Sequence, residues 1–340
     1  MKDVKETLTA CPDCVDDGRR DFLKKCGCAA AVITFSSLFS RPLLANLIRQ
    51  DKPAKSTSAS NDILVKLYKS LSDSQKKKIA FPWNHKRQRY VGNLVKVVDP
   101  TISDILNKDQ RAMVRDILKG MTSEDGYKKF SKVMADDYNG FENFHCALFG
   151  EPETDKFQFM FTGHHLVLRR DGNSKDSIGF GGPIFYGHSR GDSVKNMPGN
   201  VWYYQTKEAN KIFEALDKDQ RKKALKTNAP QEGNKTIDVK SYKTNKIGIT
   251  GQDMTKEQKG LLENLVKQIL LPFRGTDSDE VQEIIKSGGG YDPVSIMFFK
   301  DSDIGSDKVW DRWLLTGPTI ALYFRGSPHV HTWVNIAKTE

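Results

Sequence analysis

Two histidines near the end of the chain, His329 and His331, have a spacing suited to holding a metal ion. They lie in the segment Pro328-His-Val-His-Thr-Trp-Val-Asn-Ile336, whose alternating pattern predicts a β-strand. Alternate side chains of a strand share a face, so both imidazoles should point the same way, about 7 Å apart. Two ligands of one Zn, Cu or Fe ion need such an arrangement. Trp333 and Asn335 continue the same face.

Three further histidines fall in a second predicted hairpin, and we expect them to approach the first pair. His164 and His165 are adjacent, so their rings would diverge on a regular strand, and only one could join the site. His165 is the favoured ligand, because it shares its predicted face with the alternating phenylalanines of that strand. His145 lies on the preceding strand, where a symmetric turn would place it opposite residues 161–163.

These five histidines define the chemistry that the sequence favours. We predict a metal site in which His165, His329 and His331 bind the ion. His145 or His164 would be a fourth ligand or a supporting group. Neutral imidazoles suit Zn or Cu, and an open position would admit water or substrate. The ion would activate water, as in a hydrolase, or, if copper, bind oxygen, as in an oxidoreductase.

Two other interpretations of the same residues stay open. In the first, the protein is a non-catalytic binding protein, whose histidines and aromatic side chains hold a metal or a small molecule without turnover. In the second, the histidines only satisfy hydrogen bonds in an aromatic core. Cys146 is interpreted as a buried apolar residue, because side chains of adjacent strand residues diverge and His145 cannot activate it.

The elements that must position the histidines are predicted strands and helices in separate runs. Strand patterns cover residues 141–149, 157–170, 177–189, 313–325 and 328–336. The first two should form one hairpin, and the last two a second hairpin that turns at Gly326-Ser327. Strands flanked by runs of helix predict an α+β fold with a mainly antiparallel sheet.

Four helices are predicted from one recurring local pattern. A cap residue is followed three positions later by Gln at Ser72, Asn107, Asp217 and Thr255, which is a capping box. A further helix is expected from Asp279 to Lys286. The spacing of the four starts is irregular, so we interpret the similarity as that of good helix starts and not as a repeat array.

The beginning of the chain carries an export signal. Its motif consists of Arg19, Arg20, Phe22, Leu23 and Lys24, and it resembles the twin-arginine signal. The apolar stretch 26–39 that follows is too short for a stable transmembrane span and fits a signal peptide. We therefore expect residues 1–45 to be a leader that the twin-arginine translocase recognises, which predicts a periplasmic or secreted protein. An uncleaved leader would tether the protein to the membrane.

The rest of the chain is expected to form one domain, residues 61–340, after a polar, Ser-rich linker at 46–60. The formal net charge is +10, but the lysines are interspersed with acidic residues, as on a solvated surface. That pattern and the expected export argue against a nucleic-acid partner. Of the five cysteines, only Cys146 lies beyond the leader, so no disulfide framework is expected.

The region 61–340 resembles the bacterial family known as domain of unknown function 3500. The resemblance is carried by Phe149-Gly-Glu-Pro152, Phe161-Thr-Gly-His-His-Leu166, Gly181-Gly-Pro-Ile-Phe-Tyr-Gly187, Gly317-Pro and His329-x-His331. The family pattern continues from His-x-His into an Arg and an Asp-rich tail, whereas Thr332-Trp333 follows here. The resemblance implies a secreted bacterial protein and no settled activity.

Overall fold

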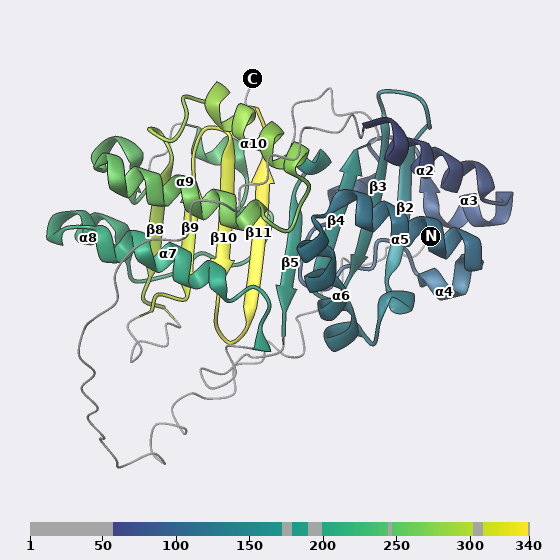
Figure 1. Ribbon diagram of the computed structural model, residues 1–340, viewed down its shortest axis with the longest axis horizontal. Helices are drawn as coiled ribbons and strands as arrows, with labels where there is room; N and C mark the ends of the chain where they lie inside the picture. Colours follow the sequence, from purple (N-terminus) through teal and green to yellow (C-terminus); the bar gives the residue numbers. More distant parts are fainter. Residues whose placement is uncertain (1–56, 172–178, 190–198, 244–246, 302–308, 339–340) are drawn as a thin grey trace, which may run out of the picture.

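The computed structural model describes residues 57–171, 179–189, 199–243, 247–301 and 309–338 (Figure 1). The predicted leader, residues 1–45, and the first part of the predicted linker lie outside these residues. Helix α2 (Thr57–Ser70) begins before the expected domain boundary, so the end of the predicted linker is helical.

Within the described residues, eleven strands form one mostly antiparallel sheet, which confirms the predicted α+β class. The order across the sheet is β1-β2-β3-β4-β5-β11-β10-β9-β8-β6, and β7 pairs with β8. Two short strands pair in parallel, β1 with β2 and β6 with β8. The strands are β1 (Ala80–Phe81), β2 (His145–Gly150), β3 (Phe157–Gly163), β4 (Leu166–Asp171), β5 (Ile184–His188), β6 (Leu225–Lys226), β7 (Ile249–Thr250), β8 (Ser295–Phe299), β9 (Arg312–Thr316), β10 (Ile320–Arg325) and β11 (Val330–Ile336).

The helices pack against this sheet. In Figure 1, α7 and α9 cross in front of β8 to β11, while α5 and α6 lie in front of the other half of the sheet. The four predicted capping boxes are confirmed, because each cap side chain accepts a backbone N–H and each Gln reaches back. Besides α2, the helices are α3 (Asp73–Ile79), α4 (Ile102–Ile105), α5 (Lys108–Met121), α6 (Glu124–Tyr138), α7 (Tyr204–Ala215), α8 (Lys218–Ala224), α9 (Lys256–Leu270) and α10 (Gly275–Ser287).

Two of the predicted strands are in fact hairpins. Residues 157–170 fold into β3 and β4, which turn at His164-His165, and residues 313–325 fold into β9 and β10, which turn at Gly317-Pro318. The expected turn at Gly326-Ser327 joins β10 to β11, as predicted. Apolar residues both precede and follow each of these two turns, so the sequence pattern predicted one long strand in each place.

The sheet is built from two similar halves. This corrects the interpretation that the four helix starts are similar only because each is a good capping sequence. The strand order is symmetric about the β5–β11 pair, where Ile184 lies opposite Val334. Equivalent positions of the two halves also meet at a second place. Thr122, which follows α5, forms a bridge with Phe273, which follows α9. The buried positions of α5 match those of α9: Gln110, Val114, Ile117, Leu118 and Met121 against Gln258, Leu262, Leu265, Val266 and Ile269.

The recurring glutamines explain why the capping boxes come in pairs. The amide groups of Gln75 and Gln110 donate to each other across α3 and α5, at 2.8 and 3.2 Å. Gln220 and Gln258 do the same across α8 and α9, at 3.0 and 2.8 Å. One side chain therefore caps its own helix and satisfies the amide of its neighbour, as buried polar groups require.

Candidate metal centre

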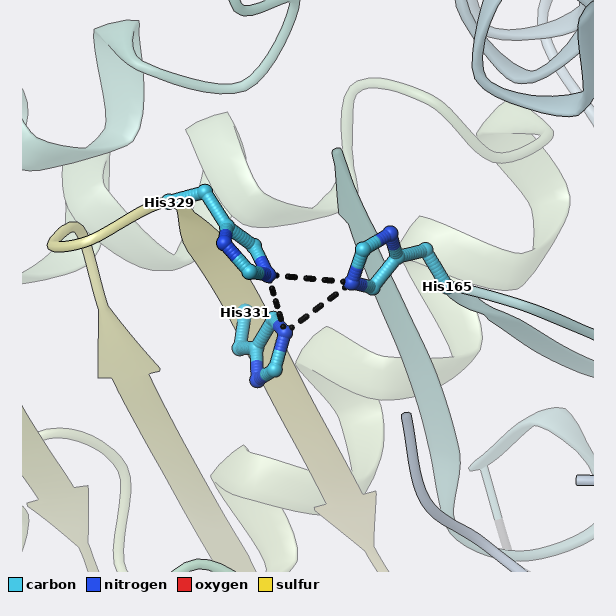
Figure 2. Close-up of side chains that lie close together, drawn as sticks. All are labelled: His165, His329 and His331. Carbon is cyan, nitrogen blue, oxygen red and sulfur yellow. Dashed lines mark hydrogen bonds between the residues drawn. The ribbon is translucent and has the colours of Figure 1, made fainter. Parts of the chain in front are cut away.

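Three histidine side chains from distant parts of the chain meet at one point beside the centre of the sheet (Figure 2). The Nε2 atom of His165 lies 3.1 Å from that of His331 and 3.1 Å from that of His329. The Nε2 atoms of His329 and His331 are 2.9 Å apart. All three residues are completely buried. The three nitrogens thus form a nearly equilateral triangle inside the protein.

The tight turn between β3 and β4 aims His165 at the other two. Its backbone is left-handed, with φ +59°, a conformation that few residues other than glycine adopt. Backbone hydrogen bonds hold the turn on both sides. The N–H of His165 donates to the Asn93 carbonyl at 2.7 Å, and the His165 carbonyl accepts from the Gly187 N–H at 2.9 Å. His165 therefore does not share the face of the β3 phenylalanines, because the strand ends at Gly163.

His329 and His331 come from the start of β11, in the other half of the fold. His331 lies on the strand, opposite Gly187 of β5 and Arg325 of β10, while His329 precedes the first strand residue. Glycine is required opposite His331. A Cβ atom on Gly187 would lie 2.5 Å from the Val330 carbonyl oxygen and 3.1 Å from Cδ2 of the His165 ring. The ligand set therefore spans the junction of the two halves.

Two carboxylates orient the imidazole rings. Asp137 Oδ2 lies 2.7 Å from His165 Nδ1, and Glu232 Oε2 lies 2.7 Å from His331 Nδ1. Carboxylates accept, so in both rings the proton resides on Nδ1 and the Nε2 lone pair faces the triangle. The same carboxylate–histidine pairing is usual around metal-bound histidines.

Converging lone pairs repel one another, and a cation bound between them would remove that repulsion. A tetrahedral ion with nitrogen ligands at about 2.0–2.1 Å would separate those nitrogens by about 3.3 Å, close to the 2.9–3.1 Å found here. Among the described residues, the group of potential ligands has these three members only, which leaves a fourth position without a protein ligand. The donor set therefore fits a small divalent transition-metal ion.

A buried cation stands next to the triangle. Nη2 of Arg325 lies 2.9 Å from both ring nitrogens of His331 and 3.5 Å from Nε2 of His329. The two nitrogens of an imidazole point apart, so equal distances to both place the guanidinium against the face of the ring. Nε of Arg325 also lies 3.0 Å from Glu232 Oε1, which anchors the guanidinium.

The other predicted site histidines lie outside the triangle. His164 stacks on His165, with ring centroids 3.9 Å apart, and its Nδ1 lies 3.0 Å from the Asp137 carbonyl. His145 Nδ1 lies 3.0 Å from the Pro100 carbonyl, and burial lowers the pKa of this ring. The structure thus brings together three of the five predicted residues, while His164 packs against His165 and His145 contacts the Pro100 carbonyl.

His188 takes part in a second contact between a histidine and a carboxylate, at the end of α6. Its Nε2 lies 3.0 Å from Asp136 Oδ2, and burial lowers the pKa of its imidazole. Asp137 accepts from Ser189 N–H at 3.0 Å and from the Ser189 hydroxyl as well. Neighbouring aspartates at the end of one helix therefore bind different histidines.

Sequence reasoning missed the polar partners of the triangle: Asp137, Glu232 and Arg325. One signal was available, since the pair Asp136-Asp137 stands in the last turn of a helix, where the dipole disfavours negative charge. Cys146 fits its prediction, because the residue is buried and burial raises the pKa of its thiol to about 12. A thiol of this kind is no nucleophile.

Comparison with known proteins adds a family and no activity. A sequence profile of the family described as "Protein of unknown function (DUF3500)" matches residues 53–333. No curated protein and no solved structure matches the chain.

Proposed function

The chain belongs to the DUF3500 family of proteins of unknown function, and we propose from the site itself that it binds one metal ion through His165, His329 and His331. The observation that carries this proposal is the convergence of three Nε2 atoms within 3.1 Å. Two of the rings donate their Nδ1 protons to carboxylates. A cation bound between the three nitrogens would relieve the repulsion of their lone pairs.

Zinc is the ion that we propose, and copper is the alternative outcome. Neutral imidazole nitrogens suit both ions, but a set of three histidines with a fourth position left to water is the usual ligand set of catalytic zinc. Thiolate or thioether ligands, which select Cu(I), are not among the three.

A hydrolytic reaction fits this ligand set best. When bound, zinc lowers the pKa of a water ligand to near 7 and so supplies a nucleophile at neutral pH. Asp137 and Glu232 hold the tautomers that keep Nε2 unprotonated, and the complete burial of the three rings excludes bulk water. These residues would therefore preorganise the ion and its surroundings, without serving as the acid or the base.

The alternative of a binding protein without turnover has one observation in its favour. All three histidines have no exposed surface, as in a closed structural site. The two functions differ in metal exchange: a closed site should release its ion only on unfolding, whereas a working site should exchange zinc for cobalt in the folded protein.

Elemental analysis of the purified protein tests the proposed centre. We expect about one equivalent of zinc in the wild type and none in the double variant His329→Ala/His331→Ala. His85→Ala is the matched control, because His85 stacks on Phe81 away from the triangle and should leave the metal content unchanged. Metal-free wild-type protein with normal folding would overturn the proposal.

We also propose that the protein is exported in folded form by the twin-arginine translocase to the periplasm or beyond. The Arg19-Arg20 motif supports this proposal. None of the described helices has the length and hydropathy to cross a membrane. Cell fractionation should find the wild type outside the cytoplasm and the variant Arg19→Lys/Arg20→Lys inside it; equal export of both would refute the route.

A further inference from the structure

The carboxylate of Asp137, which orients His165, is itself held by Ser189. Oδ2 of Asp137 lies 2.7 Å from His165 Nδ1 and 3.0 Å from the backbone nitrogen of Ser189, and Oδ1 accepts from the Ser189 hydroxyl. Both oxygens are therefore engaged, so rotation of the carboxylate would break hydrogen bonds at each of them. The two donors of Ser189 thus fix which oxygen faces the imidazole.

The position of Asp137 in the fold explains why such support is needed. Its side chain is completely buried and stands in the last turn of α6, where the helix dipole disfavours a negative charge. A buried carboxylate is stable only when hydrogen bonds or ion pairs compensate for the water that it has lost. The neutral imidazole of His165 brings one N–H to this carboxylate, and Ser189 brings two further donors.

Ser189 is in turn held in place by its neighbour His188, the last residue of β5. The His188 carbonyl accepts from Asn200 Nδ2 at 2.7 Å, and the ring Nδ1 of His188 accepts from the Val201 N–H at 3.2 Å. Because Nδ1 accepts, the ring proton is on Nε2, which donates to Asp136 at 3.0 Å. The end of β5 is thereby tied both to the chain that follows and to α6, which gives the two Ser189 donors a fixed position.

We propose that Ser189 is a positioning residue of the metal centre and acts through Asp137. Its donors hold the carboxylate so that Oδ2 accepts from Nδ1 of His165, which leaves the lone pair of Nε2 directed at the ion. The same stretch of β5 holds the backbone of His165, because the Gly187 N–H donates to its carbonyl at 2.9 Å. The inference rests on the proposed metal function and extends it to a residue that reaches the ion through two other side chains.

The zinc affinity of two Ser189 variants tests the inference. Ser189→Ala should weaken zinc binding about 3–10-fold, a smaller loss than that of a carboxylate in direct contact with the ligand. Ser189→Thr keeps the hydroxyl and should bind zinc like the wild type. Ser287→Ala is the control, because the Ser287 hydroxyl donates to the Ile284 carbonyl at 2.7 Å within α10 and its loss should leave zinc affinity unchanged. Competition with a chromophoric chelator at constant pH measures the affinities, and thermal unfolding without zinc shows that each variant is folded.

Two further readouts separate an action through Asp137 from a general effect on folding. In the Asp137→Ala background, Ser189→Ala should cause no further loss of zinc affinity, because the two residues act in series. In metal-free protein whose histidines carry isotopic nitrogen, nuclear magnetic resonance should find the His165 proton on Nδ1 in the wild type and partly on Nε2 in Ser189→Ala. A merely structural role of Ser189 would give additive losses and leave the His165 tautomer unchanged, and either result overturns the proposal.

The outcomes keep this inference apart from the function on which it rests. Wild-type protein that binds no zinc overturns the metal centre and the role of Ser189 with it. Zinc binding that is equal in the wild type and Ser189→Ala, or that is weakened equally in Ser189→Ala and Ser189→Thr, overturns the role of Ser189 alone. If Asp137→Ala does not fold, the His165 tautomer in Ser189→Ala decides.

Discussion

Replacing Asp137 by Asn should weaken metal binding without changing the shape of the site. The Asp137 side chain is fully buried and accepts from His165 Nδ1 and from both the N–H and the hydroxyl of Ser189. An asparagine keeps one acceptor oxygen but must turn its NH₂ group toward one of these donors. Where the NH₂ faces His165, the ring proton moves to Nε2 and removes the lone pair that binds the ion.

The magnitude follows from the role of such carboxylates. Loss of a carboxylate that orients a metal-bound histidine typically weakens metal affinity about 10–100-fold, which corresponds to about 1.4–2.7 kcal/mol. The stabilisation of the folded state by bound metal should fall by the same amount at a fixed zinc concentration. Zinc affinity is measured by competition with a chromophoric chelator at constant pH, and stability by thermal unfolding with and without zinc.

The adjacent aspartate supplies the matched control. Asp136 contacts His188 and Lys132, so Asp136→Asn should change zinc affinity much less than Asp137→Asn. Equal zinc affinity in Asp137→Asn and the wild type would refute the orienting role. An equal loss in both variants would show that the charge of the helix end matters and not the specific contact.

Three further outcomes are expected. Gly187→Ala should lower the free energy of unfolding by about 1–3 kcal/mol and weaken zinc binding, because the new Cβ would press on Val330 and the histidine rings of the site. Gly260→Ala is the control and should not destabilise the protein, because a Cβ atom at Gly260 would meet no neighbouring atom within 4 Å. Chemical denaturation compares the two variants. Gln258→Ala should cost about 1–3 kcal/mol in the same assay, since it unpairs buried amide partners; an unchanged midpoint would contradict this. The Cys146 thiol, whose pKa burial raises to about 12, should resist alkylation at pH 8 until the protein unfolds. Because the unfolded thiol ionises near 9, its contribution to stability is complete below that pH and is lost as the pH rises toward 12; rapid native labelling would refute the burial.

The helices could be predicted from the sequence because their signals are local. A cap residue and a Gln three positions later, as at Asn107 and Thr255, satisfy backbone groups within a few residues, whatever the rest of the chain does. The pairing of the helices into two similar halves was missed. That similarity resides in which positions are buried, and burial is decided by the sheet that the helices cover.

The histidine triangle was predicted in its members but not in its geometry. The spacing of His329 and His331 pointed to a shared site, and His165 joins them. The turn that aims His165 lacks the Asn-Gly or Asp-Gly signature of a two-residue hairpin. It is held instead by Asn93 and Gly187, which are distant in sequence. For the same reason, Glu232 carried no local signal, because it reaches the site from a loop in the other half of the fold.

X-ray absorption at the metal edge shows directly whether histidine side chains bind the ion. For zinc-loaded protein, we expect nitrogen ligands at about 2.0–2.1 Å. We also expect the outer-shell scattering of three imidazole rings, which the variant His329→Ala/His331→Ala should lose. A shell made only of oxygen atoms, or one that the double substitution leaves unchanged, would contradict the assignment of His165, His329 and His331 as the metal ligands.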